Sequence, residues 1–400
     1  MPLLATDCTT GGAFVLDKKA SHSASVEVED GWIVQVRAGN LVVVARGQAS
    51  ESAEIAHSRG VEAVQRALDL LSMRGEGDLM ARGMEDEHLI WWTTGGRSVL
   101  RAYAVSNLPL RVPGVTFRVT DAAGNEVPPP VRPEPNWHPS FRYFRLAQVS
   151  EEVFDAYRNL FLALESVLST AVPTQQGERE RDWIARALRH AQGLGLDLAP
   201  YARQGAVDPV AEIVTDLYSA TRTATFHAKA GRDTLLPLDP VDRRAVLDSL
   251  SRLGGLYLRL ADLILGARRP GSGFFVGGFN MVVGSAVDLL EVQVTDDPVR
   301  VSEDDDPAIN PGGGVVKALP TRSTPELDQR FLRTRLGEIA VAELVDLACV
   351  TRIVATSPNG DPLAFGQLEA TLTLGGFDVF EAALGVRGVN VNPPRSHYTL

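Results

Sequence analysis

A histidine and three fixed cations lie close together near the middle of the chain, in the sequence YSATRTATFHAKAGRDTLLP at residues 218–237. Arg222 and His227 are separated by four small or apolar residues, and Lys229 and Arg232 follow. Arginine stays charged and offers a planar fork of donors that fits phosphate oxygens. Histidine donates or accepts a proton near neutral pH. The pair is sufficient for metal-free RNA cleavage: a base removes the 2′-hydroxyl proton, the hydroxyl attacks phosphorus, and the cation stabilises the developing charge.

The spacing of this pair sets a geometric condition. In a straight α-helix five residues turn through about 500°, which leaves the two side chains roughly 140° apart. The side chains converge if the helix loosens or ends near Thr225, and both Thr223 and Thr225 are β-branched. Alternatively, two copies of the motif face one another across a dimer, and each site is completed by both chains. The sequence leaves both arrangements open.

Other candidate sites have weaker support. The glycine-rich GSGFFVGG at 271–278 lacks the GKS or GKT ending of a phosphate loop. The acidic run 303–306 lacks the alternating ligands of a calcium loop. The remaining histidines are scattered singly, and no serine lies in a GxSxG elbow. We therefore expect neither a metal nor a cofactor.

Composition limits the class of protein. The chain has 400 residues, 44% of them hydrophobic, and a formal net charge of −11, which argues against a general nucleic-acid coat protein. Residues 141–270 carry 17 Lys and Arg against 16 Asp and Glu, so the acidity belongs to the flanks. Cys8 and Cys349 are too far apart in sequence to indicate a disulfide framework. With no secretory signal and no apolar run long enough to span a membrane, we expect a reduced, cytoplasmic protein.

The pattern of apolar residues predicts an α+β multidomain chain. We expect a β-rich N-terminal domain at 1–120, a proline-rich linker at 121–140, a helical domain at 141–270 and a C-terminal mixed α/β domain at 271–400, whose acidic, Gly- and Pro-rich loop spans 296–325. Hairpins are expected around Asp30-Gly31 and Gly95-Gly96, with a helix at 60–74. In the C-terminal domain we expect a strand at 286–294, a helix at 325–350, and hairpins at 358–360 and 375–376.

Four amphipathic helices are expected in the middle of the chain. The first begins at Ser150 as N-cap, and the second spans about 178–195. Asp208-Pro209 and Asp239-Pro240 open the third and fourth, because each combines a capping carboxylate with proline at the first helical position. Gly266 ends the last helix. Helices of this length and pattern make a bundle.

The motif and its helical setting resemble the HEPN superfamily, whose members carry Arg, four to six residues and then His late in a bundle helix. TFHAKAGR with the following Pro-Leu-Asp stretch, and the earlier FDAYRNLFLALESVLS, are similar to the Apea-like and methylamine-utilisation-J-like branches. The resemblance covers about residues 141–266. It implies a central four-helix HEPN-like bundle, flanked by N-terminal and C-terminal β-rich α+β domains.

The resemblance also implies a function and a set of residues. Many members of the family are metal-independent endoribonucleases of antiviral defence or toxin systems, and they dimerise through the bundle. Carried over, Arg222 and His227 are the catalytic pair, Lys229 and Arg232 contact phosphate, and Glu165 is a polar support. Active members commonly have Asn, Asp or His after the arginine, where this chain has Thr223, which we include among the supporting residues.

Two functions follow from this comparison. The first is an RNA-cleaving effector, with RNA, a second copy of the chain and a regulatory protein or phage-derived trigger as partners. Its acidic flanks would act as sensor, oligomeriser or restraint. The second is a non-catalytic scaffold that binds a nucleotide or a partner protein.

Overall fold

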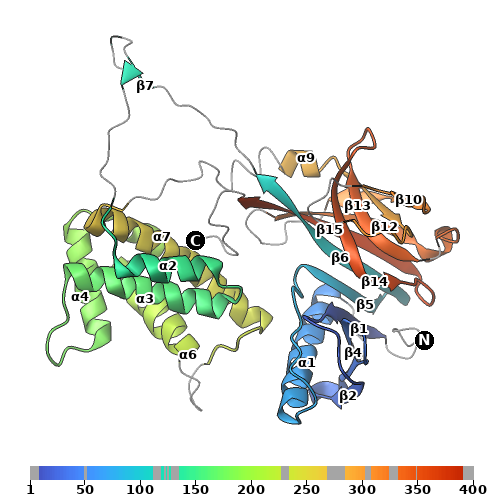
Figure 1. The fold of residues 1–400 in the computed structure, drawn as a ribbon, viewed down its shortest axis with the longest axis horizontal. Helices are drawn as coiled ribbons and strands as arrows, with labels where there is room; N and C mark the ends of the chain where they lie inside the picture. The colour runs from blue at the N-terminus through green and yellow to red at the C-terminus, as the bar shows by residue number, and fades with distance from the viewer. Residues whose placement is uncertain are drawn as a thin grey trace. The chain divides into compact units, whose positions relative to one another are not determined.

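The chain forms two units, one built from both ends of the sequence and one from its middle (Figure 1). Unit 1 comprises Met1–Leu110 and Gly273–Val389, and unit 2 comprises Arg111–Ser272 and Asn390–Leu400. The α+β multidomain architecture expected from the sequence is therefore present. The computed structural model describes residues 9–48, 52–110, 119–120, 123, 126–127, 135–226, 234–267, 284–301, 308–323, 332–347 and 349–390.

A nine-stranded sheet forms much of unit 1, in the order β11-β12-β15-β6-β5-β1-β4-β3-β2. Its strands from the beginning of the chain are β1 (Thr10–Val15), β2 (Ala24–Glu27), β3 (Ile33–Val36), β4 (Val42–Gly47), β5 (Glu87–Thr94) and β6 (Arg97–Leu110). Its strands from the end of the chain are β11 (Thr321–Ser323), β12 (Leu332–Ala340) and β15 (Val379–Asn390). The two flanks meet where β6 lies beside β15.

This arrangement differs from the division into separate domains at 1–120 and 271–400. Alternating apolar and polar residues show that a segment is a strand with one buried face, but they do not say which strand lies beside it. The expected helix at 325–350 is wrong over its described residues, 332–347 and 349–350. Helix-forming residues there are overridden by antiparallel pairing of β12 with β15, and among these described residues only Val341–Glu343 is helical, as the short 3₁₀ turn η5.

Local turns are predicted more successfully. β2 and β3 form a hairpin around the 3₁₀ turn η1 (Glu29–Gly31), where Asp30 and Gly31 have φ of 58° and 71°. β5 and β6 pair across Gly95 and Gly96, which have φ of 56° and 75°. Both turns use the positive φ angles that a tight hairpin requires.

A second sheet of unit 1 has the order β10-β9-β13-β14. Its strands are β9 (Glu291–Thr295), β10 (Val316–Leu319), β13 (Val350–Thr356) and β14 (Pro362–Leu372). The hairpin expected at 358–360 joins β13 to β14, whereas the turn at 375–376 leads from β14 to β15 in the larger sheet and is not a hairpin. The strand expected at 286–294 begins only at Glu291, after the short helix α9 (Ser285–Val287).

The two sheets of unit 1 share a hydrophobic core. Leu100 and Phe380 of the larger sheet belong to the same buried cluster as Val294 and Ile353 of the smaller one. At the other end of the larger sheet, α1 (Ala53–Met73) buries Val64 and Leu68 with Phe14 of β1. Inward-facing residues of both sheets therefore form the core, as in packed β-sandwiches.

Unit 2 is mainly helical and has a core of its own. Its described helices are α2 (Pro139–Val149), α3 (Val153–Ala171), α4 (Glu180–Gly193), η2 (Ala199–Tyr201), α5 (Pro209–Ile213), η3 (Val214–Arg222), α6 (Thr223–Phe226) and α7 (Pro240–Leu265), and β7 (Val119–Thr120) pairs with β8 (Glu126–Val127). α3 packs against α2 and α7 (Figure 1). The expected linker at 121–140 lies mostly outside the described residues.

The ends of these helices follow the sequence closely. Asp208 and Asp239 each accept two backbone N–H groups at the start of α5 and α7, and Gly266 ends α7 with φ of 64°. The expectation that a helix begins at Ser150 is wrong. Ser150 ends α2, where its hydroxyl donates to the Leu146 carbonyl, and Glu152 caps α3.

Candidate active site

Arg222 is the last residue of η3, which is a π-helix. Its wider turn joins each N–H to the carbonyl five residues earlier. The Tyr218 carbonyl accepts both the backbone N–H and the hydroxyl of Thr223, the latter at 3.2 Å. Ser219 similarly donates its hydroxyl to the Val214 carbonyl at 3.3 Å. The hydroxyl-rich sequence thus stabilises the widened helix, and the hydroxyl of Thr223 is turned back onto that helix.

Three aromatic rings surround the guanidinium of Arg222. Its central carbon lies 4.9 Å from the ring centroid of Phe226, 5.2 Å from that of Tyr218 and 5.7 Å from that of Phe161. Attraction between a cation and ring faces holds such a group in place. The Arg222 side chain is 18% exposed, so it is positioned but still reachable from solvent.

Two carboxyl groups complete this cluster. An Nη of Arg222 donates to Glu180 at 2.9 Å, and the Tyr218 hydroxyl donates to the other Glu180 oxygen at 3.0 Å. Glu165 of α3 lies 3.9 Å from the same Arg222 nitrogen and is hydrogen-bonded to Glu180. The cluster therefore joins residues of α3, α4 and η3.

Glu165 and Glu180 differ in charge. Burial, followed by the hydrogen bond to Glu180 and the charge of Glu180, raises the pKa of Glu165 to about 8, and the nearby Arg222 offsets this only in part. Two carboxyl groups this close cannot both ionise without a large penalty. The two carboxyl groups therefore share one proton near neutral pH, and Arg222, which lies closer to Glu180 than to Glu165, favours the negative charge on Glu180.

A second set of charges holds η3 in place. The buried Asp216 of η3 is paired with Arg203 at 2.5 Å and with Arg252 of α7. The Tyr157 hydroxyl of α3 donates to the Leu217 carbonyl at 2.6 Å. These contacts anchor the π-helix to its neighbours and so fix the direction in which Arg222 points.

Of the residues expected at the site, Arg222 and Glu165 lie together, and Thr223 serves the backbone of η3. His227, Lys229 and Arg232 lie outside the described residues, which end at Phe226 on this side. Sequence reasoning missed Phe161, Glu180, Tyr218 and Phe226. The four-residue spacing of Tyr218, Arg222 and Phe226 places them on one helix face and could have revealed two of these. Tertiary packing of α4 brings Glu180 next to Arg222, and no local sequence pattern around Glu180 predicts this contact.

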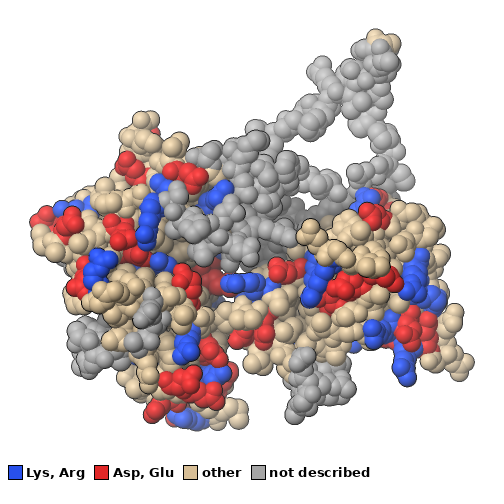
Figure 2. All heavy atoms as spheres, turned by 180° about the vertical axis from the view of Figure 1, so that it is seen from behind, with Lys and Arg blue, Asp and Glu red and all other residues tan. Residues whose placement is uncertain are grey.

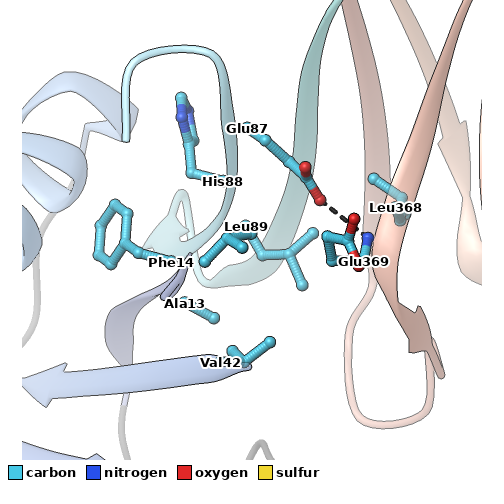
Figure 3. A pocket seen from close by; sticks show the side chains of 9 residues that line it. Ala13, Phe14, Val42, Glu87, His88, Leu89, Leu368 and Glu369 are labelled. Atoms are coloured by element: carbon cyan, nitrogen blue, oxygen red, sulfur yellow. Dashed lines mark hydrogen bonds between the residues drawn. The ribbon is translucent and has the colours of Figure 1, made fainter. Parts of the chain in front are cut away.

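Two cavities of unit 1 differ in size and lining from the cluster around Arg222. One has a volume of about 20 Å³, room for roughly one water molecule. Its lining includes Glu87, whose carboxylate accepts the Glu369 N–H at 2.9 Å (Figure 3). A second cavity of about 360 Å³ is lined by Arg322 and Glu338, which are paired with one another at 3.1 Å.

Within the described ranges, no group of three or more His, Cys, Asp and Glu side chains could hold a metal ion. None of the helices in those ranges is long and apolar enough to cross a membrane. On the face drawn in Figure 2, basic side chains are interspersed with acidic ones over the described surface.

A family model for methylamine utilization protein MauJ matches residues 140–260. The match runs from α2 into α7 and includes Glu165, Glu180 and Arg222. It confirms the resemblance of this segment to the methylamine-utilisation-J-like branch of HEPN-like proteins, and also its limits within the chain. Comparisons with curated proteins and with solved structures give no significant match.

Proposed function

We propose that unit 2 is a HEPN-type, metal-independent endoribonuclease in which Arg222 and His227 act on one phosphodiester. The observation that carries this proposal is the fixed position of Arg222, held by aromatic rings at the end of a π-helix. His227 follows five residues later in the sequence. The resemblance to a family that includes many such nucleases supports the same function.

The chemistry needs only the RNA and these side chains. His227 takes the 2′-hydroxyl proton, and the 2′-oxygen attacks the adjacent phosphorus. The bond from phosphorus to the 5′-oxygen breaks, that oxygen takes a proton from water as it leaves, and His227 returns its own proton to the solvent. Arg222 stabilises the charge on the non-bridging oxygens. The products end in a 2′,3′-cyclic phosphate and a 5′-hydroxyl.

The wider setting extends this proposal. We infer a homodimer or a larger even-numbered assembly, in which two copies of the motif form one cleft, with Lys229 and Arg232 contacting phosphate. The nuclease would serve as an RNA-cleaving effector of antiviral defence or as a toxin in the cytoplasm. Unit 1 would respond to a regulatory protein or a phage-derived trigger. The acidic flanks would repel bulk RNA and so lower the activity of the nuclease in the resting chain.

The first prediction concerns the catalytic pair. In EDTA, the parent should cleave RNA, and His227→Ala should lower the rate by about 10²–10⁴-fold because it removes the acid–base group. Arg222→Lys should also fail to cleave RNA, because an ammonium group cannot reproduce the planar fork of donors of a guanidinium group. Cleavage is measured on total RNA with analysis of the product ends. The matched control is His190→Ala, which replaces an exposed histidine of α4. Cleavage by His227→Ala at the parental rate, or an absolute need for magnesium, would contradict the mechanism.

A second candidate function is a non-catalytic scaffold that binds a nucleotide or a partner protein. The ion pair between Arg222 and Glu180 and the use of the Thr223 hydroxyl by its own helix favour it. Nucleotide binding measured by calorimetry, without cleavage of any RNA, would distinguish the scaffold from the nuclease.

A further inference from the structure

Glu180 is held by three donors of the kind that bind phosphate oxygens. One Glu180 oxygen accepts from the Arg222 guanidinium at 2.9 Å, and the other accepts from the Tyr218 hydroxyl at 3.0 Å. Glu165 supplies a further hydrogen bond. Guanidinium and hydroxyl donors arranged around an anion are the usual means of holding a phosphate group.

Two of the donors are more deeply buried than the carboxylate that they hold. Arg222 and Glu165 are 18% and 21% exposed, whereas the Glu180 side chain is 35% exposed. Glu180 is the first residue of α4. A change of its side-chain rotamer would move its carboxylate into water while keeping it near the favourable positive end of the helix.

Arg222 also has donor capacity left. Its Nε is buried and has no hydrogen-bond partner among the described residues. One carboxyl oxygen of Glu165 is likewise buried without a hydrogen-bond partner there. A buried polar atom without a partner is costly, so a ligand that reaches it gains free energy. An RNA phosphate at this position could engage more of the guanidinium fork than Glu180 does.

We propose that Glu180 is an internal substitute for phosphate, which occupies the Arg222 site in the resting chain and must be displaced by RNA. The inference rests on the proposed role of Arg222 in contacting an RNA phosphate. Glu180 acts against binding in two ways, because it neutralises Arg222 and because its charge repels the incoming phosphate. Its effect therefore falls on substrate affinity, and the chemical step is left unchanged.

The second prediction tests this competition on the full-length chain. Glu180→Gln should bind a fluorescein-labelled 2′-O-methyl oligonucleotide about tenfold more tightly by fluorescence anisotropy at low salt, because the competing charge is gone. Glu180→Asp keeps the charge but is too short to reach Arg222 in the same way, so it should also bind more tightly. The matched control Asp182→Asn removes an exposed charge from the same first turn of α4 and should have little effect.

The outcomes separate this inference from the nuclease proposal. The 2′-O-methyl probe has no nucleophile, so its binding does not depend on His227. Tighter binding by both Glu180 variants, with no cleavage of ordinary RNA by any protein, supports the competition and contradicts the nuclease. Cleavage by the parent, with Glu180 variants that bind no more tightly, overturns the competition and keeps the nuclease. If Glu180→Gln fails to fold, the affinity of Glu180→Asp for the oligonucleotide tests the competition instead. On ordinary RNA the expected change is a lower KM at unchanged kcat, and a lower kcat would mean that Glu180 positions Arg222 for catalysis.

Discussion

At the scale of single residues, the proton held by Glu165 is the feature with the clearest consequence. The folded chain retains this proton up to a pKa of about 8, whereas an unperturbed glutamate loses it near 4.5. The unfolded chain therefore binds fewer protons than the folded chain between these values. Stability falls as the pH rises through this window, and the loss is complete above the folded-state pKa.

The third prediction follows from this fall in stability with rising pH. Relative to the parent, Glu165→Gln should become more stable as the pH rises from 5 to 9, by about 2–4 kcal/mol, because the amide does not ionise. The measurement is urea unfolding followed by circular dichroism at each pH. Glu151→Gln, which replaces an exposed glutamate of unit 2, is the control for loss of charge alone. A stability difference that does not change with pH would show that Glu165 is not protonated in the folded chain.

At the scale of elements, the π-helix determines where Arg222 points. The Tyr218 carbonyl accepts the N–H and the hydroxyl of Thr223, and Thr221 is hydrogen-bonded to Ser249 of α7 at 3.0 Å. Returning η3 to an α-helix would break this pattern and rotate Arg222 relative to Glu180. A π-helix this long is rare, and such segments occur frequently at functional sites.

The fourth prediction tests that role. Thr223→Val keeps the shape of the side chain but removes its hydroxyl, and it should lower stability by about 0.5–1.5 kcal/mol. RNA cleavage should fall as well, because the widened turn that orients Arg222 is weakened. Thr215→Val is the matched control, since Thr215 is exposed on the same helix. Unchanged stability and cleavage in Thr223→Val would mean that the backbone alone maintains the π-helix.

The elements also show which features the sequence could predict. The turn at Gly95-Gly96 and the caps at Asp208 and Asp239 depend on neighbouring residues, so the sequence predicts them. β12 pairs with β15, which begins about forty residues later, and no local pattern contains that information. The residues of the candidate site also differ in whether the sequence predicts them. Arg222 belongs to a recognisable motif, whereas Glu180 is 42 residues away and reaches Arg222 only through packing.

At the scale of the whole molecule, the two units differ in how they depend on the order of the chain. The core of unit 2 is formed by residues between Ala147 and Ala261. The core of unit 1 combines residues from both ends of the sequence, as Leu100 and Phe380 illustrate. Unit 2 is therefore expected to fold from one continuous fragment, whereas unit 1 needs both of its segments.

The fifth prediction concerns this difference. A fragment of residues 135–270 should fold cooperatively, with a helical circular dichroism spectrum, because its core lies within it. If unit 1 restrains the nuclease, the fragment should cleave RNA faster than the full chain under the same conditions. Equal or lower activity from a folded fragment would indicate that unit 1 assembles the active form.

The shared sheet also determines the order in which the protein is completed during synthesis. β6 ends at Leu110, and its neighbour β15 begins only at Val379. At a translation rate of about 5–20 residues per second, this edge of β6 waits roughly 13–54 s for its partner. The helices that the structure describes in unit 2 are complete by Leu265, well before that. In the growing chain the middle is finished before the beginning, so a ribosome that stalls between the two leaves a complete Arg222 site joined to a sheet with an open edge.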